Sequence, residues 1–330
     1  MRKIYFGGLS YLKIAIIAVA SVSLTVGAFV GLSYWEKNSG KFSEREVLEE
    51  TVSYKGKEYV LNDNVETFLV LGLDKFDGDE KLESYNNNKQ ADFLMLFVFD
   101  NDSKKYTAIH INRDTMVDIN VLGVAGNRVD TIKGQIALSH TYGNGKDLSC
   151  HNTADSVSSL LMGMKVNHYA SLTLDSVAVV NDLVGGVEVE VLDDFTGIDE
   201  SLVKGETVVL DGEQALKYVQ SRQELDDSTN STRMKRQQQY VNALYKAFNK
   251  CVEADDEFVV DASLAIADYM ISDRSVTQLQ ALAEKFGEYE FLGIESLAGK
   301  SVLGEEFMEF YADEKTTKEL VIKLFYVPEE

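Results

Sequence analysis

Residues 93–111 read FLMLFVFDNDSKKYTAIHI, which is two apolar runs on either side of a polar segment. The runs Phe93–Phe99 and Tyr106–Ile111 are rich in aromatic and β-branched residues, which favour strands. The Asp, Asn, Ser and Lys residues between them have the composition of a turn. The stretch therefore predicts an antiparallel hairpin.

The pairing within this hairpin predicts which side chains meet at its open end. With the turn centred just after Asp102, Asp92 lies opposite Arg113, and cross-strand partners sit about 5 Å apart. A third apolar run, Thr67–Gly72, has the length of a buried strand and is followed by Asp74. If this run is parallel to the second strand of the hairpin, Asp74 reaches the same end of the sheet. We therefore expect carboxylates and a guanidinium group to converge there.

The rest of the chain alternates between helical and strand patterns. Residues 154–162 and 174–183 predict helices, Val187–Val191 predicts a strand, and Asp211 begins a capping box that starts another helix. This alternation is typical of a mixed α/β fold. With 330 residues and 45% hydrophobic content the chain can bury a full core, and no linker follows residue 64, so we expect a single domain.

Arginine side chains gather in one segment of an acidic protein. Arg222, Arg233 and Arg236 lie within 15 residues, although the net charge is -22. In a helix that begins near residue 232, Arg233, Arg236, Gln237 and Tyr240 share a face by i, i+3 and i+4 spacing. Planar, forked donors on such a face suit phosphate oxygens, so the segment predicts a phosphate site. The alternative is that these arginines are solvated charges at helix ends.

The converging carboxylates suggest a metal ion. Asp74 and Asp92 would offer Mg²⁺ two oxygen ligands, with phosphate and water completing its shell. The ion would neutralise phosphoryl oxygens while arginines carry the remaining charge, which is what phosphoryl transfer requires. Two simpler interpretations stay open: the aspartates are turn or cap residues, and Arg113 and Asp114 form a structural ion pair.

Other kinds of site lack support in the sequence. The acidic composition argues against a nucleic-acid partner, because proteins that bind nucleic acids carry broad basic surfaces. The GxSxG, GxGxxG and HExxH patterns are absent, and Gly143–Lys146 lacks the spacing of a P-loop. The two cysteines, Cys150 and Cys251, have no CxxC or Cys-His spacing. Outside the membrane they either form a disulfide or remain two unpaired buried thiols.

The N-terminal part of the chain predicts a membrane anchor. Ile14–Trp35 contains no charged residue and, at about 33 Å as a helix, can cross a hydrocarbon layer of roughly 30 Å. Basic residues precede this segment, so we expect residues 1–13 in the cytoplasm and the chain after residue 35 outside. A signal peptide cleaved after the small residues Ala18–Ala20 is the alternative. The charged segment 36–64 is interpreted as a stalk with a helical tendency.

Six motifs, taken together and in order, resemble those of the LytR-CpsA-Psr family, over about residues 64–250. They are NVETFLVLGLD (64–74), ADFLML (91–96), INRDTM (111–116), LVGGV (183–187), LDGEQALKYVQSR (210–222) and RMKRQQ (233–238). The resemblance implies a three-layer α/β/α fold with a central mixed sheet, a catalytic core at 65–250 and a C-terminal α/β extension at 251–330 packed on that core. Family members are single-pass membrane proteins with an extracellular domain. They move a phosphoglycopolymer, such as teichoic acid or capsule polysaccharide, from a polyprenyl-pyrophosphate carrier to peptidoglycan.

The resemblance also implies roles for individual residues. The matching Mg²⁺-linked aspartates are Asp74 and Asp92. The matching pyrophosphate-binding set is Lys75, Arg113, Gln220, Arg222, Arg233, Arg236 and Gln237. The catalytic candidates are Asp92, Arg113, Asp114 and Arg222, with Asp92 or Asp114 accepting the proton of the acceptor hydroxyl. Candidates for lining a polyprenyl tunnel, which are otherwise ordinary core residues, are Phe93, Leu160, Val177, Val180, Leu216 and Val241.

Three positions depart from the family pattern. Lys75, Gln90 and Gln220 stand where the family often has arginine. One hypothesis is a membrane-anchored, Mg²⁺-dependent phosphotransferase with an altered substrate preference. The other is an inactive polyprenyl-phosphate binding protein that acts as a scaffold or attenuator of wall assembly.

Overall fold

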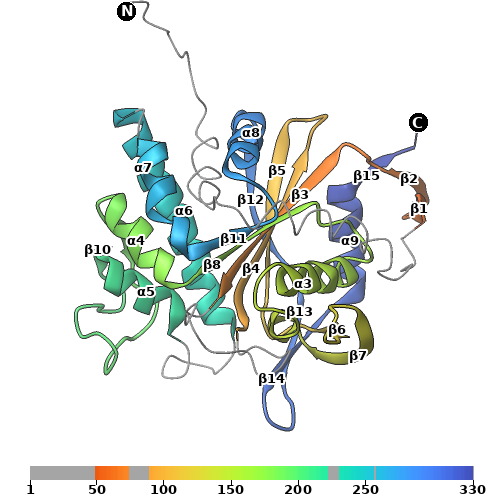
Figure 1. Cartoon of the computed structure of the whole chain (residues 1–330), viewed down its shortest axis with the longest axis horizontal. Coiled ribbons are helices and arrows are strands. Elements are labelled where there is room, and N and C mark those ends of the chain that lie inside the picture. Colours follow the sequence, from red (N-terminus) through yellow and green to blue (C-terminus); the bar gives the residue numbers. More distant parts are fainter. Residues whose placement is uncertain (1–48, 74–88, 222–229, 256–257, 330) are drawn as a thin grey trace, which may run out of the picture.

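The computed structural model describes residues 49–73, 89–221, 230–255 and 258–329. Its centre is a six-stranded mixed sheet in the order β11-β8-β3-β4-β5-β12, in which β8 is parallel to β3 and β12 is parallel to β5 (Figure 1). The strands of this sheet are β3 (Val65–Leu73), β4 (Ala91–Asp100), β5 (Lys105–Ile111), β8 (His168–Thr173), β11 (Met270–Ser272) and β12 (Glu290–Ser296). The prediction of a mixed α/β fold with a central mixed sheet is confirmed.

The hairpin formed by β4 and β5 has the predicted register. Leu94 pairs with Ile111 at one end of the hairpin, and Asp100 pairs with Lys105 at the other. Extending this register two residues beyond Leu94 places Asp92 opposite Arg113. Strand β3 is antiparallel to β4, so it runs in the same direction as β5, as expected. The expected position of Asp74, directly after β3, lies outside the described residues.

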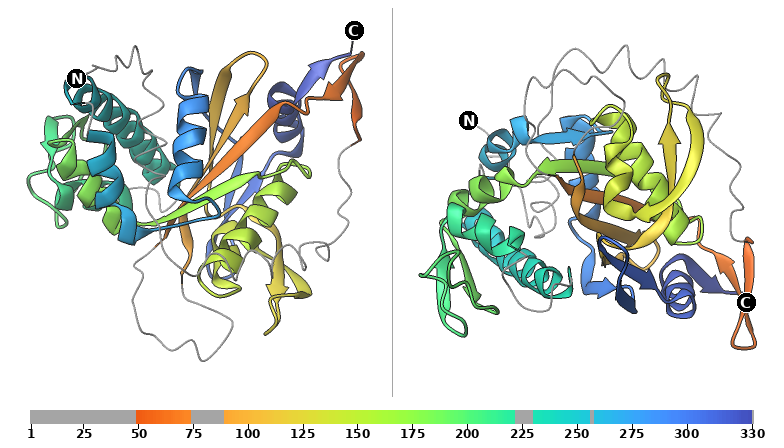
Figure 2. Two further views of the ribbon diagram at one scale, coloured as in Figure 1. Left: turned by 45° about the horizontal axis from the view of Figure 1, so that its top comes forward. Right: turned by 90° about the horizontal axis from the view of Figure 1, so that it is seen from below.

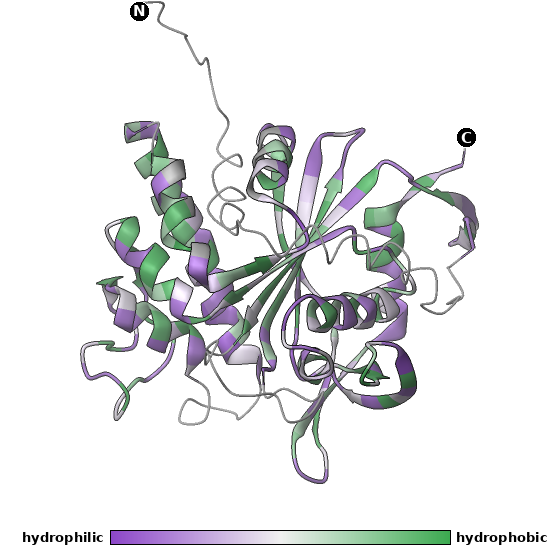
Figure 3. Cartoon of the chain, in the orientation of Figure 1, coloured by the Kyte–Doolittle hydropathy of each residue, from purple (hydrophilic) through white to green (hydrophobic). Residues whose placement is uncertain are grey.

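The two faces of the sheet bury different side chains, because successive residues of a strand point to opposite sides. Leu69 and Leu71 pack with α3 (Asp147–Leu160) and α9 (Glu314–Phe325) on one face. Phe68 and Phe99 pack with α8 (Val276–Phe286) on the other face, where the ring of Phe99 stacks on that of Phe286 with centroids 3.8 Å apart. Figure 2 shows helices on both sides of the sheet, and Figure 3 shows the apolar character of its strands.

A second group of elements packs beside the sheet around its own apolar cluster, which includes Phe195 and Tyr218. It contains α5, which begins with the predicted capping box of Asp211 and Gln214, and the long helix α6. The bounds of its elements are α4 (Asp175–Leu183), β9 (Val187–Glu190), β10 (Thr207–Leu210), α5 (Gly212–Gln220) and α6 (Asn230–Ala254). The first turns of α6 lie at the end of the central sheet where β4 begins, since Arg233 of α6 lies beside Asp92 of β4.

The chain after residue 250 is built into the sheet. We expected it as an extension packed on the core, but its strands β11 and β12 form both edges of the central sheet. Its last strand, β15 (Tyr326–Pro328), pairs with β2 (Lys57–Leu61), which pairs with β1 (Thr51–Tyr54). The helical tendency predicted for 36–64 is therefore wrong for its described part, because β1 and β2 form a hairpin and residues 59–61 of β2 pair with the C-terminal strand.

The remaining elements were not expected from the sequence or were expected only in outline. Two hairpins project from the sheet end that carries the site, β6 with β7 and β13 with β14. The bounds are β6 (Met116–Leu122), β7 (Arg128–Gln135), η2 (Ile136–Thr141), α7 (Phe258–Ala265), η3 (Ala267–Tyr269), β13 (Gly299–Leu303) and β14 (Met308–Ala312). Within the described ranges no helix has the length and apolar character needed to cross a membrane, and the expected span at 14–35 lies outside those ranges.

A charged cluster joins α8 and β11 to the sheet at the end opposite the site. His168 contacts Glu66 through Nε2 at 3.2 Å and Asp273 through Nδ1 at 3.4 Å, and the Nε of Arg274 lies 2.8 Å from Nδ1. Lys285 pairs with Glu66. Burial and Arg274 act to lower the pKa of His168, but hydrogen bonds to Asp273 and Glu66 raise it above its ordinary value. The hydrogen bond from His168 lowers the pKa of Glu66 to about 2. Lys285 acts in the same direction, whereas burial acts to raise this pKa.

These shifts predict a pH window for stability. The raised pKa of His168 contributes stability below about pH 6.5, which is lost as the pH rises through the folded pKa. The lowered pKa of Glu66 contributes stability above about pH 4.5, which is lost as the pH falls towards 2. We expect the free energy of unfolding, measured by urea titration, to fall more steeply between pH 6.5 and 8.5 in the native chain than in His168→Gln. If the free energy of unfolding depends on pH with the same slope in both proteins, His168 does not contribute to this pH dependence.

Candidate functional site

The candidate site lies where β4 begins and β5 ends. The Nη1 of Arg113 donates to Oδ1 of Asp92, and its Nη2 donates to Oε1 of Gln90. The two charged side chains are only 12% and 11% exposed. The hairpin register therefore produces the pair of residues that it predicted, in a partly desolvated position where charge interactions are stronger than in water.

Arg233 brings a second guanidinium group to the same carboxylate. It lies in the first turns of α6, is 3% exposed, and places Nη1 3.9 Å from Oδ2 of Asp92. Its Nε donates to Oδ1 of Asn230 at 2.8 Å. Two planar cations from separate elements thus face one carboxylate, which is an arrangement that can grip an anion with several oxygens.

Asp114 lies behind Arg113, away from solvent. It is 2% exposed, its Oδ1 is 3.6 Å from Nε of Arg113, and it accepts a hydrogen bond from Nε2 of Gln135 at 3.1 Å. Gln135 also donates to the carbonyl of Met308 at 2.7 Å, which ties β7 and β14 to the site. The structural ion pair that we left open for Arg113 and Asp114 is present, in addition to the contact with Asp92.

Arg236 has a different environment from Arg233, one turn earlier in the same helix. It is fully buried, and its Nη1 pairs with Asp193. Its Nε donates to the carbonyl of Tyr218 at 2.8 Å, and its Nη2 donates to the carbonyl of Ser221. These contacts fasten α6 to the end of α5. No pattern in the sequence indicated Asp193 as the partner of Arg236.

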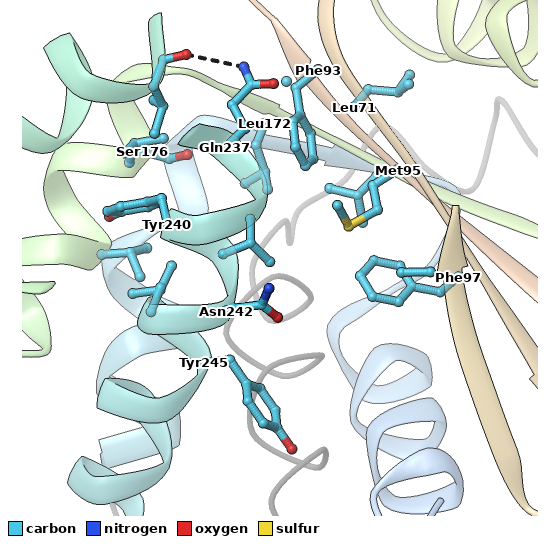
Figure 4. Close-up of a pocket in the computed structure, with 18 of the residues that line it drawn as sticks. Leu71, Phe93, Met95, Phe97, Leu172, Ser176, Gln237, Tyr240, Asn242 and Tyr245 are labelled. Carbon is cyan, nitrogen blue, oxygen red and sulfur yellow. Dashed lines mark hydrogen bonds between the residues drawn. The ribbon is translucent and has the colours of Figure 1, made fainter. Parts of the chain in front are cut away.

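The two glutamines assigned to the pyrophosphate-binding set differ in exposure. Gln237 is 5% exposed and donates to the carbonyl of Val219 at 3.1 Å (Figure 4). Gln220 is the exposed last residue of α5. The four residues expected on one face of α6 do share its buried side: Arg233, Arg236, Gln237 and Tyr240. Asp74, Lys75 and Arg222 lie outside the described residues.

An apolar cavity of about 250 Å³ adjoins the arginine site. It lies between the sheet and α6, and Phe93, Met95 and Phe97 of β4 line it opposite Tyr240 and Tyr245 of α6 (Figure 4). Four of the six expected tunnel residues line it, namely Phe93, Val177, Val180 and Val241. Leu160 packs instead on the opposite face of the sheet, and Leu216 is not in the lining.

His110 lies on the cavity face of β5, where its side chain packs against Phe93 and is affected by the charge of Arg233. It is 1% exposed, and its ring centroid is 5.0 Å from that of Phe93. Burial, followed by the positive charge of Arg233, lowers the pKa of His110 to about 3, while a hydrogen bond with Gln237 acts against this. The imidazole is therefore neutral at physiological pH and adds no charge to the site.

Among the described residues, Asp92 supplies one carboxylate at the site that is suited to be a ligand of a Mg²⁺ ion. Asp92 is partly exposed and adjoins the arginine pair, and Mg²⁺ commonly takes one or two protein carboxylates plus phosphate oxygens. Among the residues that the structure describes, no group of three His, Cys, Asp or Glu side chains could hold a metal ion. The second expected ligand, Asp74, lies outside the described residues.

The two cysteines are not joined. Cys150 is buried on α3, where its thiol lies 3.5 Å from Oγ of Ser171, and Cys251 is on α6, where its thiol lies 3.7 Å from the carbonyl of Val184. These helices cover opposite faces of the sheet, whereas a disulfide requires Cα atoms within about 7 Å. The disulfide alternative is therefore wrong for this structure. Burial raises the pKa of the Cys150 thiol to about 12, so this thiol is not a nucleophile.

The fold and the site define an α/β domain that can hold an anion next to an apolar chain. The model of the LytR_cpsA_psr family matches residues 32–306, so the chain belongs to this family. The resemblance found in the sequence motifs is thereby confirmed.

Named relatives work on the cell wall. The chain is 27% identical over 238 residues to the polyisoprenyl-teichoic acid–peptidoglycan teichoic acid transferase TagU of Enterococcus faecalis, covering 71% of this chain and 70% of that protein. It is 30% identical over 183 residues to the cell wall biosynthesis protein LcpA of Corynebacterium glutamicum, covering 51% of this chain and 33% of that protein. The solved structure of TagT bound to LI-WTA shares the fold, with a TM-score of 0.57 and 20% identity over 85% of this chain and 98% of that one.

The environment of Arg236 predicts a structural role. Arg236→Ala should lower the free energy of unfolding in urea by about 3–5 kcal/mol, because it leaves the buried Asp193 without its partner. The double variant Arg236→Met with Asp193→Leu should recover most of this loss, because neither charge then remains buried. If Arg236→Ala instead unfolds like the native chain and loses only affinity for pyrophosphate, the side chain serves the ligand and not the fold.

Proposed function

We propose that this protein transfers a phosphoglycopolymer from a polyprenyl-pyrophosphate carrier to peptidoglycan. In this proposal the chain is anchored in the cell membrane by residues 14–35 and acts outside the cell. The named transferase among its relatives supports the type of reaction. The observation that carries the proposal is the junction of the arginine site with the apolar cavity, because a lipid pyrophosphate is an anion joined to a long apolar chain.

The geometry suits the two parts of such a substrate. The forked donors of Arg113 and Arg233 would hold pyrophosphate oxygens, and the cavity behind Phe93 would take the first part of the polyprenyl chain. Both arginines are largely desolvated, so their contacts with a phosphate would be stronger than at an open surface. Binding the two parts together also fixes the phosphate against the acceptor.

In the proposed reaction a sugar hydroxyl of the acceptor attacks the phosphorus that carries the glycopolymer. The new P–O bond joins the glycopolymer phosphate to the acceptor, and the P–O bond to the carrier breaks and releases polyprenyl phosphate. Asp92 is the better candidate to accept the hydroxyl proton, because Asp114 is 2% exposed and lies behind Arg113. A Mg²⁺ ion held by Asp92, together with Asp74, would neutralise phosphoryl oxygens.

A binding protein without transfer activity is the second candidate. The contact that motivates it is Gln90, which stands where the family often has arginine and accepts a hydrogen bond from Arg113. A neutral amide at this position reduces the positive charge near the site. This candidate requires carrier binding without product at any Mg²⁺ concentration.

The transfer assay uses a labelled glycopolymer on a polyprenyl-pyrophosphate carrier and peptidoglycan oligosaccharides as acceptor. We expect product with the native chain and Mg²⁺, and a fall of at least about 100-fold in both Arg113→Ala and Asp92→Ala. The first removes a cation that would hold the reacting phosphate, and the second removes the proposed proton acceptor and Mg²⁺ ligand. Arg128→Ala, at an exposed position of β7, is the matched control and should act normally. Normal transfer by Asp92→Ala would contradict the proposed site, whereas carrier binding without transfer by the native chain would favour the binding protein.

A second variant separates the lipid cavity from the anion site. Val180→Trp should fill the cavity, so turnover of the polyprenyl-linked substrate should fall at least about tenfold, while inorganic pyrophosphate should bind with unchanged affinity in calorimetry. Val129→Trp, at a side chain that is 61% exposed on β7, is the control for the added indole. Undiminished turnover by Val180→Trp would show that the carrier chain does not occupy this cavity.

A further inference from the structure

Two buried asparagines connect the elements that carry the two site arginines. Asn112 follows β5, next to Arg113, and Asn230 opens α6, one turn before Arg233. The Nδ2 of Asn230 donates to Oδ1 of Asn112 at 3.0 Å. These amides are 5% and 2% exposed. A hydrogen-bonded bridge therefore crosses from the sheet to the helix directly at the site.

The direction of every hydrogen bond in this bridge is fixed by chemistry. A backbone N–H and a guanidinium N–H can only donate, so Oδ1 of Asn112 accepts from the N–H of Asp114 at 3.0 Å, and Oδ1 of Asn230 accepts from Nε of Arg233 at 2.8 Å. The amide nitrogen of Asn230 is then left to donate to Asn112. Each asparagine is held in one orientation, and the bridge runs from the turn of Arg113 to the guanidinium group of Arg233.

We propose that Asn112 and Asn230 are positioning residues that fix Arg233 relative to Arg113 and do so without neutralising it. Arg236 shows the contrast within the same helix, because a buried carboxylate, Asp193, neutralises it. A neutral amide sets the orientation of Arg233 and adds no negative charge beyond that of Asp92, which lies 3.9 Å from Nη1, so Arg233 can still act on an anion.

The inference rests on the proposed function, because its consequence is measured on pyrophosphate. The spacing of the two guanidinium groups determines whether both can reach oxygens of one ligand. Since Arg113 and Arg233 come from elements far apart in sequence, that spacing depends on how α6 docks on the sheet end. The bridge supplies a buried polar contact at this docking point, where a lost partner is costly.

Asn230→Asp is the sharpest variant. The carboxylate keeps the acceptor for Nε of Arg233 but adds a negative charge to it and removes the donor to Asn112. We expect the affinity for inorganic pyrophosphate, measured by calorimetry, to fall at least tenfold while the melting temperature stays within a few degrees of the native value. Asn167→Asp is the matched control, because its Oδ1 accepts from Thr67 at the opposite end of the sheet. Its affinity for pyrophosphate should be native.

The bridge itself is tested by a double-variant cycle with Asn112→Ala and Asn230→Ala. If the two amides act as a unit, the double variant binds pyrophosphate no more weakly than the weaker single variant, because either change alone breaks the contact. Native affinity in both single variants and in Asn230→Asp would overturn the proposal. So would losses of affinity that follow losses of melting temperature, since this pattern describes a purely structural contact.

Failure of the proposed function gives a different result. If the native chain neither binds pyrophosphate nor transfers the glycopolymer, the proposed function is wrong, and the positioning role that rests on it is wrong as well. If the native chain binds pyrophosphate and transfers the glycopolymer, and the asparagine variants have the same affinity for pyrophosphate, only the positioning role is wrong.

Discussion

The hydrogen-bonded ladder between β4 and β5 determines which side chains meet at the end of the central sheet. Its register places Asp92 against Arg113, and a shift by one residue would move every side chain of one strand to the other face. The same alternation puts Phe93 and Met95 on the cavity side and Leu94 and Leu96 in the opposite core. The anion site and the apolar cavity are therefore adjacent because one strand supplies residues to both.

Local signals made this part of the fold predictable. The turn after Asp100 and the apolar runs around it are contained in one short stretch, so the register and the contact of Asp92 with Arg113 followed from sequence. Helical spacing likewise predicted that Arg233 and Arg236 share one face of α6, which is the buried face in the structure. Their different roles could not be predicted, because the partner of Arg236, Asp193, is reached only through tertiary packing.

The same reason explains the features that the sequence did not indicate. The contact of Asn112 with Asn230 depends on the docking of a helix on a distant strand, and polar residues at such positions look like ordinary turn or cap residues. Strand β11 is only three residues long, too short for its pattern to be recognised, and it becomes a strand because β8 offers it an edge. Short edge strands and buried polar bridges are consequences of the assembled fold.

The construction of the sheet edges has a consequence for the maturation of the chain. Strands β11 and β12 close the two sides of the sheet, and β15 closes a smaller sheet whose other strands begin near residue 51. Until the last quarter of the polypeptide has arrived, the inner strands have exposed edges that invite pairing with other chains. An incomplete polypeptide is thus open to aggregation, and sheet closure is a late, non-local event that slows folding.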